Sequence, residues 1–201
     1  MARPKTRDAE LKDRMLAESI GLLEAEGPVA VTARRVASLS GTSTAAVYEL
    51  YGDKAGLIRS IFYSGFSRLA DRLDSLPRDT DARHDVVAVL EATRAFAVEL
   101  PMLFDVMFAR PFAEFDPTPA DFDAAARIHA CVIGRVAAWS RTTTRARATI
   151  DAAHALVALN RGLISSELSG LLGSSAAIRH RRRSLAIDST LDGLEGRMGA
   201  S

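Results

Sequence analysis

The side chains whose types and spacing could do chemistry lie close together, between Thr32 and Lys54. Thr32 and Ser43 each precede a short run that can form a helix, and a hydroxyl in that position can accept a hydrogen bond from a free N–H group of the first turn. The second run has about eight residues and would extend about 12 Å at 1.5 Å per residue. That length is close to the width of the major groove of B-DNA. The arrangement therefore indicates a helix-turn-helix candidate.

The first residues of the second short helix would lie nearest to base edges. Thr44 can donate or accept a hydrogen bond or touch a thymine methyl group, whereas Ala45 offers only a methyl contact. Tyr48 and Tyr51 are three residues apart, so one phenol could reach a phosphate while the other ring packs inward. Lys54 lies at the start of the next helix, where backbone N–H groups and an ammonium could hold one phosphate together.

The composition is that of an ordinary globular protein. Such a protein has a packed core on which these side chains can be positioned. The chain has 201 residues, of which 48% are hydrophobic and 25% are charged. Its net charge of +1 gives no global sign of a nucleic-acid partner, and its single cysteine, Cys131, cannot form an internal disulfide. We find no signal peptide and no run of roughly 18 apolar residues. We therefore expect a cytoplasmic protein without a membrane partner.

Helices are the only regular elements that the sequence pattern predicts. No stretch alternates polar and apolar residues over the length of a strand, which favours an all-α fold. All prolines lie at or before Pro119, so the longest helices are expected after it. The expected helices cover about 8–25, 32–40, 44–51, 53–76, 81–100, 101–110, 120–140, 143–172 and 175–198, with a proline-rich loop over 111–119.

Three segments resemble the N-terminal signature of TetR-family transcriptional regulators: 31–37 (VTARRVA), 41–43 (GTS) and 47–57 (VYELYGDKAGL). The match extends over residues 14–57 without a gap. The resemblance implies a three-helix helix-turn-helix DNA-binding domain over residues 1–54. It also implies a larger helical domain over residues 55–201 that binds an effector and dimerises.

Carried over by position, the resemblance implies a role in DNA binding for seven residues. Backbone, groove or phosphate contacts are implied for Thr32, Arg34, Ser43, Tyr48 and Lys54, and positions near base edges for Thr44 and Ala45. Glu49 and Leu50 stand where a polar or basic pair is common in the family. A carboxylate beside the groove repels phosphates, so Glu49 either accepts a hydrogen bond from a cytosine amine or faces away from the DNA.

The C-terminal part carries a second resemblance. Segments 95–108 (AFAVELPMLFDVMF) and 162–168 (GLISSEL) are similar to the TetR C-terminal domain type named for a Trp-His-Gly motif, although only Gly162 of that motif remains. This resemblance implies a homodimer formed through the last two helices and a small-molecule effector that the sequence does not identify. A dimer would present two reading helices about 34 Å apart, which suits a palindromic double-stranded operator.

Six residues are candidates for lining the effector pocket, because this region often surrounds a ligand cavity in the family: Phe104, Phe108, His129, Trp139, His154 and Asn160. Phenylalanines at a spacing of four are more often part of a core. Asn160 stands among apolar residues and needs a hydrogen-bond partner if it is buried, which could be another side chain or the effector. The basic run over residues 179–183 is most simply a solvated helix face.

No arrangement of residues indicates catalysis, a metal site or a cofactor. The run from Gly41 to Ala45 lacks the preceding strand of a nucleophile elbow. Asp151 and His154 share one helix face, but a di-iron bundle needs further carboxylates and a second histidine. We therefore expect a non-enzymatic, sequence-specific DNA-binding regulator that acts as a ligand-responsive repressor. The alternative is a helical small-molecule-binding protein or enzyme with no role at DNA.

Overall fold

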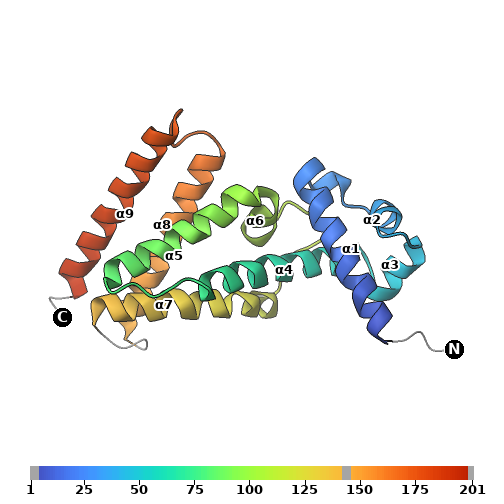
Figure 1. Ribbon diagram of the computed structural model, residues 1–201, viewed down its shortest axis with the longest axis horizontal. Coiled ribbons are helices and arrows are strands. Elements are labelled where there is room, and N and C mark those ends of the chain that lie inside the picture. The colour runs from blue at the N-terminus through green and yellow to red at the C-terminus, as the bar shows by residue number, and fades with distance from the viewer. Residues whose placement is uncertain (1–4, 142–145, 199–201) are drawn as a thin grey trace. The chain divides into compact units, whose positions relative to one another are not determined.

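The computed structural model describes residues 5–141 and 146–198, and helices are the only regular secondary structure among them (Figure 1). The predicted all-α fold is confirmed. The α-helices are α1 (Lys5–Glu26), α2 (Ala33–Leu39), α3 (Thr44–Tyr51), α4 (Lys54–Asp74), α5 (Ala82–Glu99), α6 (Pro101–Phe108), α7 (Ala126–Ser140), α8 (Arg147–Leu168) and α9 (Ala176–Met198). Two short 3-10 helices, η1 (Pro28–Ala30) and η2 (Pro119–Ala125), lie between them.

The chain divides into two compact units. The first comprises the chain up to Arg68 together with Leu100–Ala124, and the second comprises Leu69–Glu99 and the chain from Ala125 onward. Helix α6 and the segment after it thus pack with the N-terminal helices, although α5 precedes them in sequence. The expected boundary after residue 54 stays a prediction that the resemblance implies.

In the first unit, α1 packs against α2, α3 and α6. The start of α6 is held by Glu24, whose carboxylate accepts hydrogen bonds from the backbone N–H groups of Met102 and Leu103 at 3.3 and 2.7 Å. A carboxylate at this position satisfies N–H groups that a helix start leaves free. Gly65 of α4 lets the Met107 side chain of α6 approach closely, since a Cβ there would lie 2.8 Å from it. Helix α6 is therefore fixed to α1 at its start and to α4 along its length.

The segment after α6 is tied to α4 through Asp121, which is buried in η2. Its carboxylate accepts hydrogen bonds from the Tyr63 hydroxyl at 2.6 Å, from Arg59 Nε at 3.0 Å, and from the backbone N–H and hydroxyl of Thr118 at 2.8 and 2.7 Å. The predicted helix over 120–140 is therefore wrong at its start. The bonds from Thr118 wind residues 119–125 into a tight 3-10 turn, and the α-helix begins only at Ala126.

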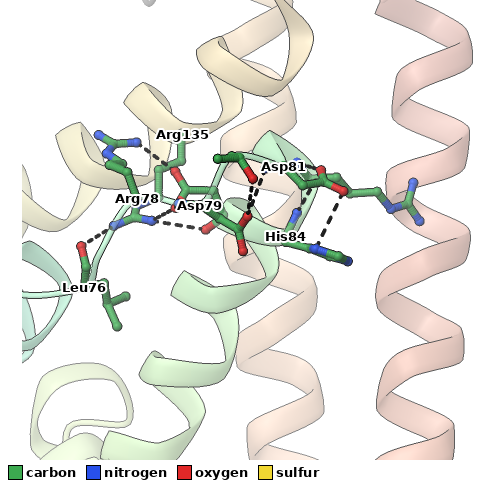
Figure 2. A network of polar contacts seen from close by, with 9 residues as sticks. Leu76, Arg78, Asp79, Asp81, His84 and Arg135 are labelled. Atoms are coloured by element: carbon green, nitrogen blue, oxygen red, sulfur yellow. Dashed lines mark hydrogen bonds and ion pairs between the residues drawn. The ribbon is translucent and has the colours of Figure 1, made fainter.

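The second unit is a helical bundle in which α5 packs against α7 and α8, and α8 also packs against α7 and α9. A buried ion pair between Asp85 and Arg135 joins the first turn of α5 to α7. Figure 2 shows that Arg135 also reaches the chain before α5, where its Nη2 donates to the Leu76 carbonyl at 3.3 Å. Arg78 donates to the same Asp85 carboxylate at 3.0 Å. Removing Asp85 would leave the buried Arg135 guanidinium without its carboxylate partner, which costs about 3–5 kcal/mol.

The Asp121 contacts predict a pH-dependent contribution to stability. The hydrogen bond from Tyr63, followed by those from Thr118, lowers the pKa of Asp121 to about 2. Because the folded pKa lies below the unfolded value of about 4, the carboxylate stabilises the fold above pH 4, and this contribution is lost as the pH falls toward 2. We expect Asp121→Asn to lower the free energy of unfolding at pH 7 by about 1–2 kcal/mol.

Urea unfolding at several pH values measures this effect. The difference between wild type and Asp121→Asn should be constant above pH 5 and shrink between about pH 4 and pH 2. Asp123→Asn, an exposed change two residues away, is the matched control and should leave stability nearly unchanged. If Asp121→Asn changed the free energy of unfolding by the same amount at every pH, the lowered pKa of Asp121 would be contradicted.

Candidate nucleic-acid interface

Helices α2 and α3 begin at the two hydroxyl caps that the sequence predicts. The Thr32 hydroxyl accepts a hydrogen bond from the Arg35 N–H at 3.3 Å, and the Ser43 hydroxyl accepts one from the Ala46 N–H at 3.3 Å. Both capping residues have extended backbone angles. Gly41, at φ 65°, lies in the turn between the helices, where its left-handed conformation suits glycine. Local sequence alone thus determines where both helices begin.

The packing of α3 separates its side chains into two faces. Ala46, Val47 and Tyr51 are buried, and α3 packs against α2 and α1. On the opposite face Ala45 is exposed, Tyr48 is 49% exposed and Thr44 is half-buried. The structure therefore brings three of the predicted DNA-contacting residues together on one accessible helix face.

Tyr51 is the phenol that packs inward. Its hydroxyl donates a hydrogen bond to the Lys12 carbonyl of α1 at 2.7 Å, and the Lys12 ammonium lies 5.3 Å from the centre of its ring. Burial raises the pKa of Tyr51 to about 12, so the phenol stays protonated and keeps donating. This contact fixes the end of α3 against α1 and leaves Tyr48 on the outside.

Two cations of the interface have carboxylate partners in the same unit. Arg35 makes a two-pronged ion pair with Glu26 at 2.7 and 2.6 Å, and this contact lowers the pKa of Glu26. Lys54 Nζ lies 2.6 Å from the carboxylate of Glu114, and that hydrogen bond lowers the pKa of Glu114. Sequence reasoning missed Glu114, because it lies 60 residues from Lys54 in a segment expected only to be a loop.

The start of α4 is capped by a carboxylate and carries a lysine. The Asp53 carboxylate accepts a hydrogen bond from the Gly56 N–H at 2.7 Å, and Lys54 is the first residue of the helix. Arg34 is exposed on α2. Thr32, Ser43 and Lys54 therefore lie at helix starts within one unit, where free N–H groups favour negative charge.

The six candidate pocket residues fall into separate groups. In the first unit, the Phe104 and Phe108 rings pack together with centroids 4.7 Å apart, and Phe108 also packs on Phe66 at 5.5 Å. In the second unit, the His129 and His154 rings lie 5.7 Å apart beside a hollow of about 10 Å³, which has room for about one water molecule. Burial, and then His154, lowers the pKa of His129.

Trp139 is buried and lines a different, open hollow with Arg83 of α5 and Glu195 of α9. The histidine pair and the tryptophan thus line different hollows of the second unit. Their role in effector binding stays a prediction.

Asn160 is buried, and its hydrogen bonds are made within the second unit. Its amide nitrogen donates to the Leu90 carbonyl at 3.0 Å, and its amide oxygen accepts from Arg183 Nη2 at 3.1 Å. Arg183 is 2% exposed and also pairs with Glu91 at 2.8 Å. The expectation that the basic run 179–183 is simply a solvated face is therefore wrong, because this arginine is the polar partner that the buried amide requires.

The described residues hold no group of three or more histidine, cysteine, aspartate or glutamate side chains that could bind a metal ion. Among the same residues, none of the helices combines the length and apolar character needed to cross a membrane.

The capped helix pair α2–α3 on an all-α scaffold defines a helix-turn-helix protein. Residues 86–187, half of the chain, match the family model described as Tetracyclin repressor-like, C-terminal domain. The chain belongs to the TetR family and is a transcriptional regulator of that family. The narrower Trp-His-Gly subtype is not confirmed. No curated protein matches the chain.

Solved structures with the same fold include distant sequences. A protein of unknown function from Rhodococcus sp. RHA1 superposes with a TM-score of 0.74 at 20% identity, over 91% of this chain and 94% of that one. A TetR-family transcriptional regulator from Streptomyces coelicolor gives 0.73 at 16% identity, over 96% and 86%. A TetR variant from Acinetobacter baumannii AYE in complex with minocycline gives 0.63 at 16% identity, over 90% and 94%. At these identities the likeness concerns the fold.

The ion pair between Lys54 and Glu114 leads to a prediction about affinity for DNA. If Lys54 holds a phosphate, the Glu114 carboxylate competes with that phosphate for the ammonium. We expect Glu114→Gln to tighten binding to duplex DNA about two- to fivefold at low salt, the range set by an exposed ion pair. The gain should be equal on operator and random sequences, because phosphate contacts carry no base information.

Fluorescence anisotropy with labelled duplexes measures this change. Asp116→Asn removes a carboxylate from the same segment that pairs with Arg110 instead, and it is the matched control. Equal affinities for wild type and Glu114→Gln across a salt series would count against competition at Lys54.

Proposed function

We propose that this chain is a homodimeric, effector-responsive repressor that inserts α3 of each copy into the major groove of a palindromic operator. The observation that carries the proposal is the exposed face of α3, which presents Thr44, Ala45 and Tyr48 from a helix whose opposite face is buried. A rod of eight residues, about 12 Å long, fits the width of that groove.

The proposed contacts to the DNA backbone use groups that remain available after capping. A hydroxyl has one donor and two acceptor sites, so Thr32 and Ser43 can each accept the capping N–H and still donate their own hydrogen to a phosphate oxygen. Tyr48 can donate its phenol hydrogen, and Arg34 and Lys54 add positive charge. These five contacts would set the register of the protein on the duplex, while Thr44 and Ala45 meet the bases.

The proposed dimer forms through α8 and α9. Small residues at helical spacing are exposed along α8, namely Ala155, Ala158, Gly162 and Ser165. On α9, Leu185 is 68% exposed. Small side chains allow two helices to approach closely, and a second copy would cover the exposed leucine. Because a two-fold dimer presents two symmetry-related copies of α3 to the DNA, the operator is expected to be a palindrome.

The proposed regulation is a shift between two dimer geometries. An effector that binds the C-terminal domain better in a geometry with the wrong helix spacing lowers the affinity for the operator by that difference in binding free energy. The Acinetobacter protein is in complex with minocycline, and the effector of this chain is a small molecule still to be identified. The six candidate pocket residues are the positions to test. Such a regulator works in the cytoplasm and needs no catalytic group, metal or cofactor.

Binding to the DNA upstream of the protein's own gene tests the proposal. We expect a shifted band at nanomolar to tens-of-nanomolar protein, with at least a thousandfold weaker binding to a random duplex of equal length. Light scattering should give the mass of two chains for the free protein and of two chains plus one duplex for the complex. Equal binding to both duplexes, or a single-chain mass at working concentrations, would refute it.

Thr44→Ala and Lys54→Ala should change DNA binding in different ways. Lys54→Ala should weaken binding to every sequence and reduce the slope of log K against log salt by about 0.9 per lost phosphate, hence about two for a dimer. Thr44→Ala should leave the slope unchanged and relax the preference at one base pair of each half-site. Equal losses for Thr44→Ala on operator and random DNA would exclude a base contact.

A further inference from the structure

The one charged side chain of α3 belongs to Glu49. Successive residues of an α-helix are rotated by about 100°, so residues 44, 45, 48 and 49 lie on one side of α3. The buried residues Ala46, Val47 and Tyr51 lie on the other side. Glu49 is exposed, like its neighbours Ala45 and Tyr48. Glu49 therefore lies on the same exposed side of α3 as the residues predicted to lie near base edges, which favours a hydrogen bond from a cytosine amine over a carboxylate that faces away from the DNA.

Within the described residues, Glu49 makes no ion pair and no side-chain hydrogen bond, although basic residues are close in sequence. Arg35 is engaged by Glu26 at 2.6 and 2.7 Å, and Lys54 is engaged by Glu114 at 2.6 Å. The negative charge on the exposed face of α3 is therefore not neutralised by these neighbouring cations. In a groove between two phosphate strands, such a charge is unfavourable unless a donor of the DNA pairs with it.

The major groove offers few donors to a carboxylate. An ionised carboxylate only accepts hydrogen bonds. Guanine presents two acceptors there, and thymine presents an acceptor and a methyl group, so neither can pair with it. Cytosine presents its N4 amino group as a donor with no acceptor on the same base edge. Adenine has an amino group, but its N7 acceptor lies beside it and repels the second carboxylate oxygen.

We propose that Glu49 is a specificity-determining residue that accepts a hydrogen bond from the N4 amino group of a cytosine in each operator half-site. The proposal rests on the proposed function, since it requires α3 to enter the major groove. Thr44 tolerates several bases and Ala45 offers only a methyl group, so the carboxylate gives this helix its sharpest discrimination. It also repels phosphates at sites that lack the cytosine, which weakens non-specific binding.

Selection from a random duplex pool with full-length wild type and Glu49→Gln tests the assignment. We expect wild type to enrich a palindrome with a cytosine at one fixed position of each half-site. Glu49→Gln should lose that preference or move it to adenine, which a glutamine side chain pairs with through N6 and N7. Glu10→Gln removes an exposed carboxylate from α1 and is the matched control, which should keep the cytosine. Both variants should unfold at the wild-type temperature.

A chemical change in the DNA supplies a second measurement. N4-methylcytosine keeps its pairing with guanine but replaces the groove-facing N–H with a methyl group. Placing it at the selected position should weaken wild-type binding roughly tenfold or more, the range of one good base contact. The same substitution should change the affinity of Glu49→Gln less than threefold.

The possible outcomes separate the two proposals. The same motif for wild type and Glu49→Gln at every position, or no effect of the methyl group on wild type, would overturn the role of Glu49 and leave the proposed function standing. Failure of wild type to enrich any motif would overturn both.

Discussion

The direction in which α3 faces is decided by its packing, because a helix of eight residues has little stability of its own. Ala46 and Val47 fill the inward face, and the Tyr51 hydroxyl anchors the last turn to the Lys12 carbonyl. A rotation of about half a turn would exchange the outward residues for the buried ones. Any base contact by α3 therefore depends on these inward contacts, although none of the three residues is expected to touch DNA. The rest of the first unit serves to hold this short helix at one rotation.

Hydrogen bonds and ion pairs of three carboxylates hold the segment Leu100–Ala124 against the N-terminal helices. Glu24 holds the start of α6, Asp121 holds η2 to α4, and Glu114 reaches Lys54 at the first turn of α4. This segment lies inside the range 86–187 that matches the C-terminal family model. The same stretch of chain is thus continuous with α5 of the second unit and bonded to the helices of the first. Helix α5 ends at Glu99 and α6 begins at Pro101, so a single residue separates the two helices in the chain.

Local signals in the sequence predict the helices well. Pairing between charged residues that lie far apart in the sequence could not be predicted. Thr32 and Ser43 are recognisable as caps because the groups they bind lie three residues away, and α3 has the predicted bounds. The pairing of Lys54 with Glu114 joins residues 60 positions apart, and nothing in either neighbourhood marks the other. The same holds for Asn160: the sequence shows that a buried amide needs a partner, but nothing near Arg183 in the sequence marks it as that partner. A buried guanidinium is uncommon, so only the packed structure shows where one is needed.

The charge pattern of the first unit favours specificity over raw affinity. Two basic residues near the reading helix are already paired with carboxylates, and DNA binding exchanges one anionic partner for another. The net electrostatic gain per lysine or arginine is therefore smaller than for a free cation, and non-specific attraction is reduced with it. The chain as a whole has a net charge of only +1. In the proposed homodimer, tight binding would then depend on both copies of α3 meeting matching base edges at once. The proposed regulator would respond to small changes in helix spacing, since both half-sites would have to fit at the same time.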